Sequence, residues 1–252
     1  MDTPREIDDQ NTLQEEMMGR KLIDLTQEIY NGMPVYPGHQ RTVIFDVKTH
    51  EETAELNKPG RHSSTVMGIL MCDHGPTHVD AFVHIDPSPK AESIDQLPLD
   101  LFYTPAVCLD VSHRKAGEYI TLQDLEQACA KAKLKVEKGM TVLLYTGHFN
   151  RAYPKMEWLL QYPGIDEAAM LWMADRGVVN VGVDSPSIDS SAEMKNKNYP
   201  AHRVCRERKI LNTENLAHLD KVVGKRFDFV GFPLLIRKGT GSPIRAVAVL
   251  SD

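Results

Sequence analysis

One short segment holds most of the residue types in this chain that could do chemistry. Residues 72–84 read CDHGPTHVDAFVH, and His74, His78, Asp80 and His84 stand at relative positions 0, 4, 6 and 10. Imidazole and carboxylate groups together are the usual ligands of a divalent metal ion in hydrolytic sites. A single histidine on an apolar segment is more often a satisfied core residue, but four ligand-type side chains at even spacing indicate a metal site or an acid/base site.

The spacing also constrains how this segment folds. Every separation is even, so a regular strand would place the four side chains on one face. Ten extended residues would span roughly 33 Å, which is too long for ligands of one ion. The segment must therefore bend, and the Gly-Pro pair at residues 75–76 supplies a turn between His74 and His78. Asp80 then becomes a strand neighbour of His78, whereas His84 lies close to Asp80 only if the chain coils after it.

The segment resembles the signature of a known family. The pattern H-x-x-x-H-x-D-x-x-x-H is typical of the cyclase-like metal-dependent hydrolases, which include bacterial kynurenine formamidase and isatin hydrolase. The usual form is H-T-G-T-H-x-D-x-P-x-H, whereas here the glycine is moved by one place, Pro76 precedes Thr77, and the proline before the last histidine is replaced. The four functional positions are intact, so these departures bear on the pocket and the substrate more than on the metal.

A second block downstream is similar to the same family. His202 is followed twelve residues later by Glu214, at the start of a Glu-Asn-Leu stretch, and the family has a histidine and a glutamate in this spacing and context. Without the resemblance, these two residues would be read as a surface histidine and a surface glutamate. Tyr36 stands where the family places an aromatic residue against the substrate ring, and a packed turn aromatic is an equal alternative for it.

The resemblance implies a role for each ligand-type residue. His74, His78 and Asp80 would hold a divalent ion, Mn²⁺ or Zn²⁺, with water in the open position. His202 and Glu214 would complete the site, either by binding a second ion that Asp80 bridges or by orienting water beside a single ion.

His84 is the candidate general acid/base, because an imidazole with a pKa of about 6.5 can transfer a proton in either direction. The reaction that the resemblance implies is hydrolysis of an amide C–N bond next to an aromatic ring. The chain is longer than the compact kynurenine formamidases, which slightly favours isatin over N-formylkynurenine as the substrate. A cyclase or dehydratase that uses the metal as a Lewis acid is one alternative. A metal-binding protein without catalysis is another, but such a protein would have no use for His84.

Composition excludes several other classes of protein. The chain has 252 residues, 42% hydrophobic and 25% charged, which is compatible with one large domain. A net charge of −6 argues against a nucleic-acid partner and against an anionic membrane surface. We expect no transmembrane helix and no secretory signal, since no apolar run approaches 18 residues and the N-terminus is polar. The four cysteines are scattered without a C-x-x-C pair, which favours reduced thiols and a cytoplasmic protein.

The elements that must position these residues alternate between strands and helices. We predict strands at residues 21–26, 42–48, 106–111, 141–146 and 178–183, helices from Thr121 and over residues 165–175, and a C-terminal hairpin of residues 227–236 and 244–250. Residues 51–62 are polar and are predicted to form a loop, which is a candidate lid over the site. This order predicts a mixed α/β fold.

The resemblance implies more about the architecture. It implies a swivelling β/β/α domain with a barrel-like mixed β core and a few flanking helices. We expect residues 1–20 to be a flexible N-terminal extension and residues 21–252 to form a single domain. The resemblance also implies a homodimer or a homotetramer.

Overall fold

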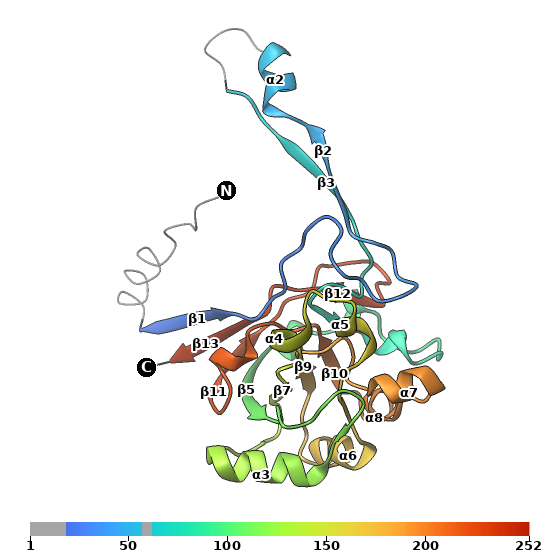
Figure 1. Cartoon of the computed structure of the whole chain (residues 1–252), viewed down its shortest axis with the longest axis vertical. Helices are drawn as coiled ribbons and strands as arrows, with labels where there is room; N and C mark the ends of the chain where they lie inside the picture. Colours follow the sequence, from blue (N-terminus) through green and yellow to red (C-terminus); the bar gives the residue numbers. More distant parts are fainter. Residues whose placement is uncertain (1–18, 57–61, 252) are drawn as a thin grey trace.

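A mixed β-sheet lies at the centre of the molecule. The computed structural model describes residues 19–56 and 62–251, so nearly all of the expected N-terminal extension lies outside the described residues (Figure 1). The strands of the central sheet are β1 (Arg20–Asp24), β4 (His78–Asp80), β5 (Tyr103–Asp110), β7 (Thr141–Tyr145), β9 (Asn180–Val183), β10 (Leu211–Glu214), β11 (Arg226–Val230), β12 (Gly241–Pro243) and β13 (Val247–Ser251). Their order is β1-β13-β11-β5-β7-β9-β10-β4-β12.

The direction of the strands changes across the sheet. The four central strands, β5, β7, β9 and β10, are parallel, and the strands on either side of them are antiparallel to their neighbours. The sheet forms a half-barrel. The mixed α/β fold that the sequence predicts and the barrel-like mixed core that the resemblance implies are therefore confirmed.

Both faces of the parallel strands are buried, which explains why they are apolar runs rather than alternating ones. In β5, Val107 and Leu109 belong to one hydrophobic core, and Ala106 and Cys108 belong to the other. All four side chains are fully buried. Side chains of consecutive residues point to opposite faces of a strand, so the two cores lie on the two sides of the sheet.

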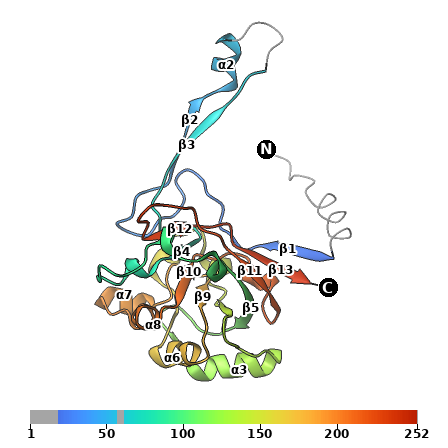
Figure 2. The same cartoon turned by 180° about the vertical axis from the view of Figure 1, so that it is seen from behind.

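Three helices cover the first of these cores, as Figure 2 shows for α6 and α8 beside the sheet. They are α3 (Leu122–Ala132), α6 (Glu167–Asp175) and α8 (Pro200–Arg208). The predicted start of α3 is correct, because Thr121 and Asp124 form a capping box. The smaller elements are α4 (His148–Ala152), α5 (Glu157–Leu160), α7 (Ser191–Asn196), the strand pair β6 (Tyr119–Ile120) and β8 (Gly164–Ile165), and four 3₁₀ turns at residues 82–84, 94–96, 99–102 and 219–221. None of the helices in the described residues is long and apolar enough to span a bilayer.

A β-hairpin projects from the body of the molecule. Its strands are β2 (Val43–Lys48) and β3 (Val66–Leu70), and α2 (His50–Leu56) stands at its far end (Figures 1 and 2). The predicted loop and lid at residues 51–62 are wrong as far as Leu56, because these residues are helical and lie away from the body. Residues 57–61 lie outside the described residues. The helix forms because the side chains of Thr49 and Glu52 each accept a hydrogen bond from the other residue's backbone N–H.

The C-terminal hairpin is also more elaborate than predicted. β11 and β13 do pair in antiparallel fashion, but β11 ends at Val230. The chain between them leaves the pair, forms β12 beside β4 and then returns. This excursion carries Thr240 to the edge of the sheet where the motif lies, and it is the reason that a distant residue contacts His74.

Candidate metal centre

The bend predicted within residues 72–84 is present. His74 precedes the turn, and His78 and Asp80 follow it on β4. Nδ1 of His74 lies 2.7 Å from Oδ1 of Asp80, and Nε2 of His78 lies 3.3 Å from the same oxygen. After Asp80 the chain coils into a 3₁₀ turn, which brings Nε2 of His84 to 3.9 Å from the other carboxylate oxygen.

The sheet register brings the second block to the first. β10 is antiparallel to β4, with Glu214 opposite His78 and Asn212 opposite Asp80. Oε2 of Glu214 consequently lies 3.7 Å from Nε2 of His78. His202 enters from the first turn of α8, and its Nε2 lies 3.4 Å from Oε1 of Glu214 and 3.7 Å from Oδ2 of Asp80. The six predicted metal and acid/base residues therefore lie together.

Asp80 is the centre of this cluster. It belongs to two groups of three side chains whose ligand atoms lie within 4.8 Å of one another, one with His74 and His78 and the other with His84 and His202. Its side chain is only 2% exposed. A buried carboxylate with four imidazoles around it is a donor set suited to one or two divalent ions.

Hydrogen bonds to residues outside the cluster set the ring orientation of three of the imidazoles. The Thr240 hydroxyl donates to Asp73 at 2.7 Å and so accepts from Nε2 of His74 at 2.8 Å. His78 donates from Nδ1 to the carbonyl oxygen of Pro76 at 2.9 Å. The ring nitrogens left to bind a metal ion are therefore Nδ1 of His74 and Nε2 of His78, and both face Asp80. Pro76, which departs from the usual motif, thus orients a predicted ligand.

His202 is held in the same way. Its Nδ1 donates to Oδ2 of Asp189 at 2.5 Å, which leaves Nε2 facing Asp80 and Glu214. Three imidazole nitrogens and two carboxylates therefore point at one small volume, and the carboxylates raise the pKa values of His78 and His202 against the effect of burial. Like acceptors repel one another unless a cation or protons lie between them, so the residues fit a bound divalent ion.

The electrostatics of the metal-free cluster are strongly perturbed. Burial alone would raise the pKa of Asp80, but the neighbouring imidazoles of His84 and His74 outweigh the effect of burial and hold that pKa well below its usual range. Burial, together with the nearby charge of Asp80, raises the pKa of Glu214. Burial lowers the pKa of His84 to about 4, with His74 and His202 adding to the effect and Asp80 opposing it. His84 is therefore neutral near pH 7 and able to accept a proton.

A cavity opens over this cluster. It is lined by Tyr36, His39, His74, His78, His84, Pro186, Ser187, His202, Glu214 and Asn215. Tyr36, the predicted contact of the substrate ring, lies on its wall, and its ring centroid is 5.3 Å from that of His39. His84 is about one-third exposed and faces the cavity. A small molecule in the cavity would thus lie between Tyr36 and the cluster.

Sequence reasoning assigned no role to several residues that support the site. Asp189 and Thr240 orient histidines, and Asn212 donates to Oδ2 of Asp80 at 2.7 Å and to Glu214 at 3.3 Å. Only Asn212 left a usable signal, because it stands two residues before Glu214 and so shares its face of a strand. His39 lies in a turn-rich segment without a motif, and its position on the cavity wall follows from the fold alone.

Known proteins resemble the chain in sequence and in structure. A family described as putative cyclase matches residues 23–190. A kynurenine formamidase of Salinibacter ruber is 29% identical over 231 residues, 90% of this chain and 96% of the relative. A kynurenine formamidase of Bacillus anthracis is 27% identical over 233 residues, 92% of this chain and 98% of the relative.

Two solved structures share the fold. An isatin hydrolase bound to the product analogue thioisatinate matches with a TM-score of 0.82 at 20% identity, covering 96% of both chains. Isatin hydrolase A of Ralstonia solanacearum matches with a TM-score of 0.81 at 21% identity, covering 99% of both chains. At these identities the likeness is one of fold.

Proposed function

Because the chain belongs to the cyclase family, we propose that it is a metal-dependent hydrolase that cleaves an amide C–N bond next to an aromatic ring. The observation that carries the proposal is the convergence of imidazole lone pairs from His74, His78 and His202 on the carboxylate of Asp80. The kynurenine formamidases among its relatives support hydrolysis of a C–N bond outside peptides.

His74, His78 and Asp80 would hold a divalent ion, Mn²⁺ or Zn²⁺. His202 and Glu214 would complete the site, either as ligands of a second ion that Asp80 bridges or by orienting water beside a single ion. A bound ion would supply Lewis acidity and a water molecule that ionises near neutral pH. Asn212 keeps Asp80 and Glu214 aimed inward through its two hydrogen bonds.

His84 would move the proton. Its low pKa leaves Nε2 free to accept a proton from the attacking water, and its place on the cavity wall allows it to pass that proton to the leaving nitrogen. The amide C–N bond breaks, the nitrogen gains the proton, and the carbonyl carbon keeps the water oxygen. Tyr36 would hold the aromatic ring against the opposite wall.

Two substrates fit this chemistry. Isatin carries a cyclic amide fused to an aromatic ring, and N-formylkynurenine carries a formamide on one. Length at residues 51–56 does not favour isatin, because that part of the excess lies on α2 away from the body. We propose isatin as the first substrate to test, because isatin hydrolases share the fold, and N-formylkynurenine as the second, because kynurenine formamidases are among the relatives. We propose a homodimer or homotetramer as the working form.

A paired absorbance assay tests the proposal. Purified protein is incubated with each substrate, with and without a chelator, and the ultraviolet absorbance of the substrate is followed. The metal content of the protein is measured by elemental analysis. We expect turnover of at least one substrate, its loss with the chelator, and its return when Mn²⁺ or Zn²⁺ is added. Metal-loaded protein that leaves both substrates intact would contradict the proposal and favour a cyclase, a dehydratase or a metal-binding protein.

A further inference from the structure

The chain makes a left-handed bend at the end of β10, directly after a residue of the candidate metal centre. Asn215 follows Glu214 and has a φ of 58°. In a regular strand, the side chains of two consecutive residues point to opposite faces of the sheet. The bend changes the direction of the second side chain, so Glu214 and Asn215 both line the cavity over the metal centre.

Three hydrogen bonds hold this bend in place. The backbone N–H of Asn215 donates to the carbonyl oxygen of Ser185 at 2.9 Å, and its carbonyl oxygen accepts from the Thr77 hydroxyl at 2.5 Å. The backbone N–H of Leu216 donates to the carbonyl oxygen of Val183 at 3.0 Å. Asparagine is one of the few residues besides glycine that adopt a positive φ readily. All three bonds use backbone atoms of residues 215 and 216, so the amide side chain contributes to none of them.

The amide of Asn215 has N–H groups without an acceptor. The one contact described for its side chain joins Nδ2 to Nδ1 of His78 at 3.5 Å. That ring nitrogen donates to the carbonyl oxygen of Pro76 at 2.9 Å, so two donors face each other and no hydrogen bond forms between them. An amide turned over would give Oδ1 to the ring and keep both N–H groups of Nδ2 for another acceptor.

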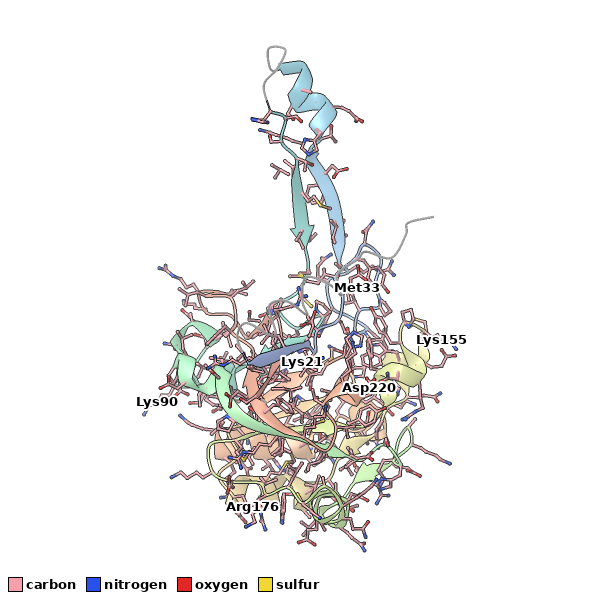
Figure 3. The ribbon with its side chains drawn as sticks, turned by 90° about the vertical axis from the view of Figure 1, so that its left-hand side faces the viewer. Lys21, Met33, Lys90, Lys155, Arg176 and Asp220 are labelled. Carbon is pink, nitrogen blue, oxygen red and sulfur yellow. The ribbon has the colours of Figure 1, made fainter. Side chains whose placement is uncertain are left out.

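The body of the molecule supplies the residues that line the cavity. None of these residues belongs to the β2–β3 hairpin, which stands clear of the body (Figure 3). Among the described residues that line the cavity, Asn215 carries the one amide side chain. An amide keeps its N–H protons over the whole pH range in which carboxylates and imidazoles titrate. Asn215 is therefore a hydrogen-bond donor whatever the charge of the cluster beside it.

We propose that Nδ2 of Asn215 donates a hydrogen bond to the carbonyl oxygen of the amide that is cleaved, an inference that rests on the proposed function. When water adds to the carbonyl carbon, one electron pair of the C=O bond moves to the oxygen, which becomes an oxyanion. A donor held beside this oxygen stabilises the oxyanion more than the neutral carbonyl, and so lowers the barrier. When the C–N bond breaks, the pair returns to the C=O bond and the nitrogen takes the proton from His84.

The position of the amide suits this role. It lies against the Nδ1 edge of the His78 ring, and Nε2 of the same ring faces Asp80. The amide and the cluster are therefore separated by the width of a single imidazole ring. Because backbone hydrogen bonds already fix Asn215, the donor is in place before the reaction and needs no reorganisation as charge develops.

Asn215→Gly removes the donor and preserves the bend, because glycine adopts a positive φ without steric strain. In metal-loaded protein we expect kcat to fall by about 10²–10³-fold, while KM and the melting temperature change little. Lys133→Gly is the matched control, since Lys133 also has a positive φ, 55°, and ends α3 away from the metal centre. The control should keep the wild-type kcat. A side chain that served only the bend would give Asn215→Gly the wild-type kcat as well, and this result would overturn the inference.

Metal titration separates a donor to the substrate from a residue that orients His78. Asn215→Gly should bind Mn²⁺ or Zn²⁺ as tightly as the wild type does, because the substitution removes no predicted ligand. Its profile of kcat against pH should also keep the wild-type shape, since an amide does not titrate. A loss of metal affinity of about 10-fold or more would make Asn215 a positioning residue for His78 and would overturn the inference.

Asn215→Asp tests the sign of the interaction. The aspartate has nearly the same shape, but its carboxylate cannot donate and repels an oxyanion. We expect its kcat to be lower than that of Asn215→Gly, with the metal still bound. An Asn215→Asp variant that is as active as the wild type would overturn the role of Asn215 alone. Metal-loaded wild-type protein that turns over neither isatin nor N-formylkynurenine would instead overturn the proposed function, and this inference with it.

Discussion

Asp189 accepts a 2.5 Å hydrogen bond from Nδ1 of His202 and, with the same carboxylate, caps the helix on which His202 stands. Its Oδ1 accepts from the backbone N–H of Ala201 at 2.7 Å, and its Oδ2 accepts from that of His202 at 3.3 Å. One buried carboxylate thus places the first turn of α8, sets the tautomer of the imidazole and aims Nε2 at Asp80.

Asp189→Ala should separate these two roles when it is compared with Asp166→Ala. Asp166 caps α6 through the backbone N–H of Ala169 at 2.7 Å but holds no predicted ligand. Asp166→Ala should lose on the order of 1 kcal/mol of unfolding free energy from the lost cap, and Asp189→Ala should lose more, because it also leaves the buried His202 ring without its partner. Only Asp189→Ala should also weaken metal binding, by about 10–100-fold, because His202 loses its orientation. Equal metal affinities in the two variants, measured by titration, would contradict this role for Asp189.

Asp80→Asn should remove metal and activity together. Asp80 is the one side chain shared by both groups of ligand-type residues, and an amide cannot supply its charge. We expect elemental analysis to find little bound metal and the assay to find no turnover. Asp24→Asn serves as the control, because Asp24 forms an exposed ion pair with Arg245, a kind of contact that contributes little to stability. An Asp80→Asn protein that keeps its full metal content would show that the ion lies elsewhere.

The site could be predicted from the sequence where its geometry is local. His74, His78 and Asp80 lie within seven residues, so a turn and a short strand determine their distances. His202 and Glu214 required the family resemblance, because the β4–β10 register that joins them to the motif is not visible in the sequence. Thr240 contacts His74 from 166 residues away and follows only from the excursion that forms β12.

The fold, like the site, could be predicted from the sequence only where its signals are local. The central strands are apolar runs, and their order of alternation with helices is enough to predict an α/β sheet. The polar composition of residues 51–56 predicts a loop, which is wrong. The Thr49–Glu52 spacing is that of a capping box, a helix-start signal that a prediction from composition does not use. That α2 stands away from the cavity depends on the hairpin beneath it, which no local pattern reveals.

The cap of α3 should give the metal-free protein a measurable loss of stability in acid. Burial alone would raise the pKa of Asp124, but hydrogen bonds from Thr121, Arg114 and His113 outweigh the effect of burial and lower this pKa to about 2. As the pH falls, the Asp124 carboxylate is therefore protonated in the unfolded chain before it is protonated in the folded protein. The stabilisation that this carboxylate gives the fold is complete above about pH 4 and is lost as the pH falls toward 2. Asp124→Asn lacks the titrating group, so its unfolding free energy should fall less between pH 4 and 2 in urea titrations. Parallel losses in the two proteins would refute this.

His84→Ala should keep the metal and lose mainly kcat. Among the six clustered residues, His84 has the most exposed side chain that faces the cavity, and its lowered pKa keeps the imidazole neutral near pH 7, so that it can accept a proton. Loss of a general acid/base slows turnover by about 10²–10⁴-fold, while KM and metal content should change little. His113→Ala is the matched control, since that histidine is exposed and bonds Asp124 in the cap of α3, away from the metal centre. If His84→Ala retained full kcat at saturating substrate, the proton would have to travel by another group, and the remaining imidazole on the cavity wall that is not a predicted ligand is His39.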